Sequence, residues 1–307
     1  MLNDIQKHIL EIVSGMAADA QGALNIRANG KRAYHSNCEG VRIESKTDKE
    51  GIDIIIDPGV KADHVYIPVV VTEEGFHDVV YNDFFIGEGA VVTINAGCGI
   101  HNCGSCDSEH DGIHTFHVGK NAVVTYSEVH YGEGEGEGKR ILNPQTILYL
   151  EEGARVTLES TQIRGVDDTK RYTKAVLKGE NAEFIVQEKL LTHGDQKADS
   201  VMDVFLDGEN SSCRVISRSV AQDESTQTFY PRVVGNTACF GHVQCDSIIM
   251  GKAKVRSIPE ISCNHVDAGL IHEAAIGKIA GDQILKLQTL GLSYEEAEEK
   301  ILEGFLR

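Results

Sequence analysis

The chain has 307 residues, of which 41% are hydrophobic and 25% are charged, so it is expected to fold around a substantial core and not to be disordered. Its 29 basic and 47 acidic residues give a formal net charge of −18, which excludes nucleic acid as an expected partner because most of the surface repels phosphate. There is no basic secretory leader and no run of roughly 18 apolar residues. We therefore expect a cytoplasmic protein without membrane contact, whose eight cysteines serve metals or chemistry and not disulfides.

The first 30 residues are predicted to form an N-terminal helical segment. Apolar residues recur there at helical spacing, at Ile5, Ile9, Ile12 or Val13, and Met16. This pattern predicts one amphipathic helix with a single buried stripe.

A repeated pattern then runs through the middle of the chain. Residues 84–94 (FFIGEGAVVTI), 116–126 (FHVGKNAVVTY) and 148–158 (LYLEEGARVTL) are similar to one another, and their alanines are 32 residues apart. Weaker copies follow at 177–182 and 205–211. Apolar and polar residues alternate within each copy, as in a strand with one buried face. Short strands at a regular period predict an all-β core that is a parallel β-helix, or solenoid, over residues 31–262.

Between two repeats lies the run 132–138 (GEGEGEG), which is predicted to be a flexible, solvated loop. Calcium binding by its carboxylates is the less favoured reading, because glycine gives them no fixed geometry.

Metal-binding residues are dense between positions 98 and 117. Cys98, Cys103 and Cys106 have the x4 and x2 separations that plant-type ferredoxins use around a cluster. Four histidines accompany them: His101, His110, His114 and His117. We predict that the three cysteines bind a metal, with the fourth ligand left open. The alternative is that the thiols are buried filler and the histidines lie on polar turns.

The last 45 residues, 263–307, are predicted to form a C-terminal helical segment. Asp282 is placed to cap a helix that ends at Gly291, and Ser293 with Glu296 forms a capping box for a second helix. The apolar residues of these helices either cap the solenoid or bind a partner, and both interpretations stay open: Ile284, Leu285, Ile301, Leu302 and Phe305.

A second set of metal-binding residues lies towards the C-terminus, comprising Cys245, Cys263, His265, His272 and Glu273. By spacing alone, a lone cysteine 27 residues from a histidine is more often a core residue, and a shared site forms only if consecutive turns stack these groups. The sequence contains neither a P-loop nor a Gly-x-Ser-x-Gly elbow, so energy from ATP has to come from another protein.

The C-terminal third resembles the SufB/SufD family. The resemblance rests on five motifs in order, at 217–221 (SRSVA), 244–251 (QCDSIIMG), 258–261 (IPEI), 272–279 (HEAAIGKI) and 291–297 (GLSYEEA) with 304–305 (GF). It is sharpest over 215–306 and looser over 84–214. It implies a right-handed parallel β-helix with helical ends that builds iron–sulfur clusters in complex with the ABC-type ATPase SufC.

The resemblance also implies roles for single residues. In SufB the cysteine of the Gln-Cys-Asp-Ser motif accepts sulfur and takes part in cluster assembly, which corresponds to Cys245 here. The acidic residue of the His-Glu-Ala motif corresponds to Glu273, and the histidine that SufD uses at this motif corresponds to His272. The chain is closest to a short SufB of the kind associated with archaea and anaerobes. Because it carries both groups, a homodimer through the β-helix is expected.

The predicted function is therefore a scaffold for assembly and transfer of a transiently bound iron–sulfur cluster, and not an enzyme. Iron would be held by Cys245, Glu273 and His272, with Cys263 and His265 as weaker candidates for cofactor binding. Cys98, Cys103 and Cys106 would form an auxiliary metal site. The expected partners are a SufC-like ATPase on the C-terminal helices and a sulfur donor protein. The alternatives are a zinc- or iron-dependent enzyme that uses the Cys98–His117 cluster and a simple electron carrier.

Overall fold

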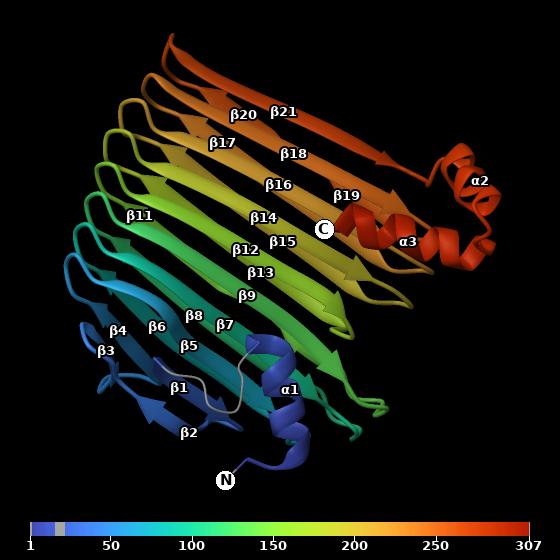
Figure 1. The fold of residues 1–307 in the computed structure, drawn as a ribbon, viewed down its shortest axis with the longest axis horizontal. Helices are drawn as coiled ribbons and strands as arrows, with labels where there is room; N and C mark the ends of the chain where they lie inside the picture. Colours follow the sequence, from blue (N-terminus) through green and yellow to red (C-terminus); the bar gives the residue numbers. More distant parts are fainter. Residues whose placement is uncertain (1, 16–21, 307) are drawn as a thin grey trace.

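Alternating apolar and polar side chains shape the whole molecule, because each strand turns one face inward and one face to the solvent. The computed structural model describes residues 2–15 and 22–306, which form a parallel β-solenoid of about eight turns with three short helices at its ends (Figure 1). This is the predicted right-handed β-helix with helical termini.

Two mainly parallel sheets enclose the interior. In spatial order the first sheet contains β2 (Lys31–Ser36), β1 (Ala23–Ala28), β5 (Lys61–Val71), β7 (Val91–His101), β9 (Val123–Glu133), β12 (Arg155–Arg164), β14 (Glu183–Thr192), β16 (Ser212–Ala221), β18 (Cys239–Ile249) and β21 (Ala268–Gly277). The second contains β19 (Lys254–Ser257), β17 (Thr226–Gly235), β15 (Lys197–Leu206), β13 (Asp168–Leu177), β10 (Arg140–Leu142), β8 (Ser108–Val118), β6 (His77–Ile86), β4 (Gly51–Ile56) and β3 (Val41–Ser45). Two further strands extend it, β11 (Gln145–Leu150) between β13 and β8, and β20 (Glu260–Cys263) beside β17. From β4 onwards the chain passes back and forth between the two sheets, with β10 and β11 as well as β19 and β20 sharing one sheet.

The sequence repeat corresponds to the pairing of neighbouring strands in the first sheet. Val91 in β7 aligns with Val123 in β9, which aligns with Arg155 in β12, so the 32-residue spacing is one turn of the solenoid. From β12 onwards the turns are shorter, since Arg155 aligns with Glu183 and Glu183 with Ser212. The extra residues of the early turns lie largely in the loops that follow β7 and β9. The weaker sequence similarity after residue 158 accompanies this change of period.

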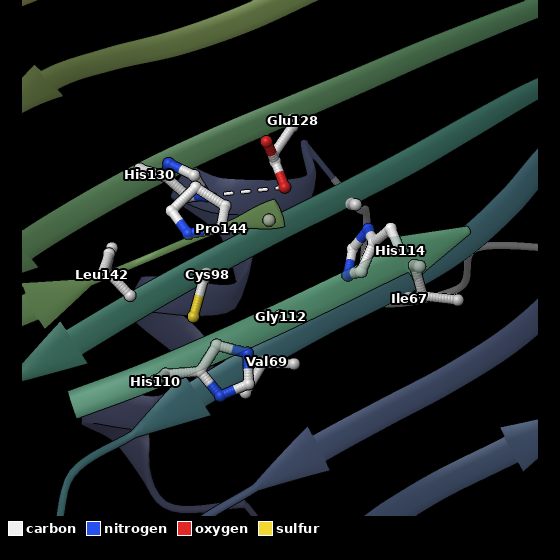
Figure 2. A pocket seen from close by; sticks show the side chains of 12 residues that line it. Ile67, Val69, Cys98, His110, Gly112, His114, Glu128, His130, Leu142 and Pro144 are labelled. Carbon is white, nitrogen blue, oxygen red and sulfur yellow. Dashed lines mark ion pairs between the residues drawn. The ribbon is translucent and has the colours of Figure 1, made fainter. Parts of the chain in front are cut away.

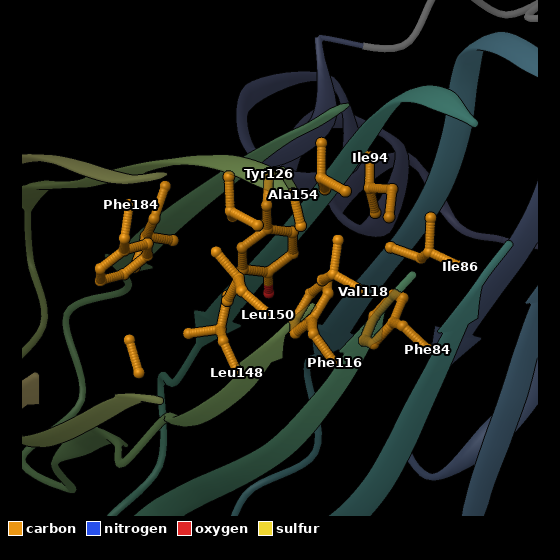
Figure 3. Packing of buried hydrophobic residues seen from close by; sticks show 14 of the residues in the cluster. Phe84, Ile86, Ile94, Phe116, Val118, Tyr126, Leu148, Leu150, Ala154 and Phe184 are labelled. Atoms are coloured by element: carbon orange, nitrogen blue, oxygen red, sulfur yellow. The ribbon is translucent and has the colours of Figure 1, made fainter. Parts of the chain in front are cut away.

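Aromatic side chains fill the centre of the solenoid (Figure 3). Phe84 of β6 and Phe116 of β8 are stacked with ring centroids 4.0 Å apart, and Tyr126 of β9 meets Phe116 edge-on at 4.9 Å. Leu148 and Leu150 of β11 continue the same core, and all five side chains are completely buried. The parallel register thus places apolar side chains of similar type next to one another along the solenoid axis.

The N-terminal helix α1 (Asp4–Ser14) is shorter than the predicted segment 1–30, because β1 already pairs with β5 from Ala23. A capping box between Asn3 and Gln6 starts it. Its buried face contains Ile9, Leu10 and Val13, whereas the predicted stripe residues Ile5 and Ile12 are exposed. Met16 lies outside the described residues.

This helix lies on the outer face of the first sheet, over β7 (Figure 1). Gly97 and Gly99 face it, and a Cβ atom at either position would overlap with Val13 or Ile9. The helix therefore approaches β7 closely because these two positions lack side chains.

The C-terminal helical segment was predicted from residue 263, but the first part of this region is strand. Residues 268–277 form β21, which pairs with β18 along its length and adds one more rung to the solenoid. The helices α2 (Gly281–Thr289) and α3 (Tyr294–Leu306) follow. Asp282 lies in the first turn of α2 and does not cap it. The capping box of α3 is present, with Ser293 and Glu296 exchanging bonds of 2.8 and 3.1 Å. In the described part of the chain, every helix is too short or too polar to span a bilayer.

Candidate functional site

Cys245 and His272 meet inside the last turns of the solenoid. Cys245 lies on β18 with its side chain directed inward and 3% exposed. His272 lies on β21, the neighbouring strand, and its Nε2 atom is 3.3 Å from the sulfur of Cys245. The two residues are 27 positions apart in the sequence and become neighbours because β21 stacks on β18.

Burial sets the protonation of both groups. It raises the pKa of the Cys245 thiol to about 11, with the Glu188 and Asp246 carboxylates acting in the same direction and the nearby Ser257 side chain opposing them. Burial also lowers the pKa of His272, and the neighbouring His242 adds to this effect. At neutral pH the pair is therefore a thiol donating to a neutral imidazole. A metal or an electrophilic sulfur has to displace the thiol proton.

Glu273 lies on the opposite face of β21, because successive side chains of a strand point to opposite sides. Its carboxylate is 3.4 Å from Nε2 of His242 and is largely exposed. The structure thus brings together Cys245 and His272, but places Glu273 on the outer face of the same strand.

The other two predicted ligands of this region lie at the turn between β20 and β21. Cys263 is the exposed last residue of β20. His265 follows in the turn, where its Nδ1 accepts the backbone N–H of Asp267 at 3.2 Å. Among the residues that the structure describes, neither forms a hydrogen bond or an ion pair with Cys245 or His272.

The site lies at an open edge of the first sheet. β21 is the last strand of that sheet and pairs only with β18 within the described ranges. Ile271 and Ile276 on this strand are 46% and 40% exposed, and Val266 in the preceding turn is 91% exposed. The helices α2 and α3 lie beside the end of the strand and leave its edge uncovered (Figure 1).

A column of polar side chains runs along the inward face of the first sheet and ends at Cys245. Glu128, Ser160, Glu188, Ser217 and Cys245 occupy aligned inward positions on five successive strands, from β9 to β18. All five are buried. The sequence prediction missed the first four, although polar residues at the inward positions of an alternating strand are the signal that could have found them.

Hydrogen bonds satisfy most members of this polar column. Tyr126 donates to Glu128 at 3.1 Å, and Ser217 donates to Glu188 at 2.8 Å. Arg171 of β13 reaches across the interior to Glu188 at 3.1 Å and also donates to Ser160. The positive guanidinium between the two carboxylates compensates their charge, which is required for buried ions.

Cys98 belongs to a small cavity at the other end of this column (Figure 2). Its thiol is buried among His110 and His114 of β8 and Glu128 and His130 of β9, the last two forming an ion pair at 3.6 Å. Burial raises the pKa of the Cys98 thiol well above its ordinary value. Burial also lowers the pKa of His114 to about 4, although the nearby Glu128 acts in the opposite direction. The cavity therefore holds a protonated thiol at Cys98 and a neutral imidazole at His114.

The predicted Cys98–Cys103–Cys106 group is not assembled as one site. Cys98 faces the interior, whereas Cys103 and Cys106 are exposed in the turn between β7 and β8. His117 lies on the outer face of β8, stacked between Phe85 and Tyr149 with centroids 5.2 and 5.7 Å away. Over residues 2–15 and 22–306, no three His, Cys, Asp or Glu side chains are arranged to hold a metal ion. The auxiliary metal site remains a prediction from sequence.

The fold and the site define a β-solenoid protein that presents a buried thiol and imidazole beside an unpaired final strand. Residues 69–305 match the family model described as SUF system FeS cluster assembly, SufBD core domain. The chain belongs to this family, whose role is iron–sulfur cluster assembly.

Relatives support the assignment. The chain is 26% identical to an iron–sulfur cluster assembly SufBD family protein of Methanocaldococcus jannaschii, over 87% of this chain and 85% of the relative. It is 27% identical to another of Pyrococcus horikoshii, over 87% and 81%. It is 29% identical to a chloroplastic member of Arabidopsis thaliana over 72% of this chain but only 41% of that protein. Its length thus matches that of the two archaeal proteins more closely.

Proposed function

We propose that the chain is the scaffold on which an iron–sulfur cluster is assembled and from which it is transferred, with Cys245 as the sulfur-accepting and iron-binding residue. The observation that supports this most is the 3.3 Å contact between Cys245 Sγ and His272 Nε2 at the open end of a SufBD-family solenoid. Thiolate and neutral imidazole are both established ligands of iron in clusters. Iron binding displaces the thiol proton, which leaves to the solvent, so that His272 stays neutral and can bind iron beside the Cys245 thiolate.

A homodimer through the end of the β-helix completes the proposed site. An unpaired strand that carries exposed Ile271 and Ile276 is a surface that a second copy can cover. Glu273 lies on the outer face of this strand. In the dimer, Glu273 would hold iron at the interface while Cys245 and His272 hold it from the interior.

A SufC-like ATPase is the proposed partner of α2 and α3, since the chain has no P-loop of its own. Leu285 and Leu290 are 60% and 73% exposed on this helical pair, and Tyr294 is 52% exposed. Closure of two such ATPase subunits on nucleotide binding would shift the two scaffolds and change access to Cys245. A donor protein would supply the sulfur.

Anaerobic reconstitution with ferrous iron and sulfide tests the assignment. Cys245→Ser and Glu273→Ala are compared with Cys213→Ser, which removes another buried inward thiol two strands earlier. We expect the first two variants to lose most of the acid-labile sulfide and visible absorption, and Cys213→Ser to retain them. An unchanged cluster yield in both Cys245→Ser and Glu273→Ala would disprove the proposed site.

A further inference from the structure

The turn between β7 and β8 contains a second thiol–imidazole pair, far along the solenoid from Cys245. Cys103 Sγ lies 3.1 Å from His101 Nε2, and His101 Nδ1 lies 3.0 Å from Glu133 Oε1. The other oxygen of Glu133 accepts the hydroxyl of Tyr131 at 2.8 Å. His101 and Glu133 end successive strands of the first sheet, 32 residues apart, so the register of the solenoid aligns them.

The turn itself is held in place by its neighbours. Glu74 accepts the backbone N–H groups of Ser105 at 3.0 Å and Cys106 at 3.2 Å, and these bonds together with the Cys106 thiol lower the pKa of Glu74. The glycine–glutamate run packs on the other side, where Gly136 donates to Asn102 at 3.2 Å. A Cβ atom at Gly136 would overlap with the backbone of Gly104, so glycine is required for this close approach. The run is therefore a fixed layer against the turn and not the flexible loop that its composition predicts.

The hydrogen bonds define which atoms carry protons. Glu133 accepts from Nδ1 of His101, which leaves the Nε2 lone pair to accept the thiol proton of Cys103. Although partial burial acts in the opposite direction, bonds from Tyr131 and His101 lower the pKa of Glu133, and His8 of α1 lies 3.9 Å from its second oxygen. The carboxylate thus orients the imidazole and stabilises it once it has taken the proton, which is the arrangement that activates a nucleophilic thiol.

We propose that Cys103 and Cys106, in the sequence Cys-Gly-Ser-Cys, form a thiol–disulfide exchange site whose substrates are disulfides with cationic groups. Cys103 transfers its proton to His101 and attacks one sulfur of the substrate, forming a mixed disulfide and releasing one substrate thiolate, which takes up that proton. The Cys106 thiol then attacks the sulfur of Cys103, its proton leaving with the second substrate thiol. The two cysteines are oxidised to a disulfide and one substrate disulfide is reduced to two thiols.

The charge around the turn supports this class of substrate. Glu74 and Glu133 contact the turn or its histidine directly, and exposed Glu135 and Glu137 belong to the run that packs on it. Among the described residues, the only ion pairs of these four glutamates are those of Glu133 with His8 and His101. Arg140 contacts the run at the carbonyl of Gly134, but its charge is paired with Asp167. Anionic disulfides are repelled here, whereas cationic ones are attracted.

The rate of mixed-disulfide formation tests the proposal on the reduced, full-length protein. Cystamine, a dicationic disulfide, is compared with oxidised glutathione, and each cysteine is quantified by peptide mass spectrometry. We expect Cys103 to react about tenfold faster than Cys263, an exposed thiol in the same molecule that serves as internal reference. His101→Ala and Glu133→Gln should remove this advantage. His77→Gln, which removes another exposed histidine–carboxylate pair, should leave it intact.

The products test the second thiol. The wild-type protein should end with a Cys103–Cys106 disulfide, two hydrogens lighter, while Cys106→Ser should retain a stable mixed disulfide on Cys103. Cys245→Ser should react like the wild type, because this activity does not depend on cluster assembly. Equal rates at Cys103 and Cys263, or identical products with and without Cys106, would overturn the exchange site. Faster reaction with oxidised glutathione than with cystamine would overturn the charge preference.

Discussion

The protein contains two thiol–imidazole pairs with nearly the same separation, 3.3 Å at Cys245 and 3.1 Å at Cys103, in opposite environments. The first is buried, its imidazole has no carboxylate partner in the described structure, and its thiol pKa is raised to about 11. The second is exposed, and Glu133 orients its imidazole. Distance alone therefore does not define the chemistry of such a pair. The buried thiol is suited to a metal that supplies its own positive charge, and the exposed thiol to direct attack on sulfur.

The largest expected difference is in alkylation. With iodoacetamide at pH 8, we expect Cys245 in the folded protein to react at least about 100-fold more slowly than an ordinary exposed thiol, because its pKa of about 11 leaves a much smaller thiolate fraction. The Cys245 rate should rise about tenfold per pH unit until the pH approaches 11. Rates at each cysteine are measured by peptide mass spectrometry. Similar rates at Cys245 and Cys103 would remove the distinction between the two pairs.

The second expected effect is a pH dependence of the free energy of unfolding, which we attribute to the buried His114 and not to exposed groups. His114 has a pKa lowered to about 4 in the folded protein, where Glu128, His110 and His130 surround it. The unfolded chain therefore takes up a proton near pH 6.5 that the folded protein refuses, so stability is complete above pH 6.5 and falls as the pH drops towards 4. The contribution is about 3 kcal/mol.

Urea unfolding at pH 7.5, 6 and 5 measures this effect. The variant His114→Gln should have a shallower pH dependence, by about one proton. Phe116→Leu is the matched control, since it alters the same core without changing a titratable group and should lower stability equally at each pH. If the free energy of unfolding of His114→Gln depended on pH as strongly as that of the wild type, another group would cause the acid sensitivity.

The fixed turn around Cys103 can be tested separately from its chemistry. Gly136→Ala should destabilise the protein by about 1–3 kcal/mol and slow the reaction of Cys103, because the added Cβ displaces the turn. Gly277→Ala, at a position with open space around it, should change stability by less than about 0.5 kcal/mol. Chemical denaturation gives the free energies of unfolding. Equal effects of the two substitutions would indicate that the run does not pack on the turn in solution.

The smallest expected effect is a change in the alkylation rate of Cys245 when the polar column is altered. Glu188→Gln removes a carboxylate that helps to raise the pKa of Cys245, while keeping an amide that can accept from Ser217. We expect alkylation of Cys245 to become a few times faster. Ser200→Ala, which removes another donor to Glu188 without removing its charge, is the matched control and should not accelerate the reaction. A slower reaction in Glu188→Gln would contradict the electrostatic assignment.

Much of the fold follows from local patterns. The alternation around Ala90, Ala122 and Ala154 predicts strands and a repeating turn, because side-chain direction along a strand is a local property of the backbone. The capping box of Ser293 and Glu296 is equally local, and the structure has it. The family resemblance also predicted roles for Cys245 and His272, and the structure brings these two side chains into contact, while the roles themselves stay predictions.

The tertiary structure decided which of the remaining groups meet. Stacking in register turns Cys98 inward and Cys103 outward, so the dense cysteine and histidine segment separates into an interior cavity and an exposed turn. The same register aligns His101 with Glu133. Composition predicts a flexible glycine–glutamate run, but close contact with the turn fixes it. Periodicity along the chain determines that a solenoid forms, whereas the faces and neighbours of single residues depend on contacts between turns about 30 residues apart.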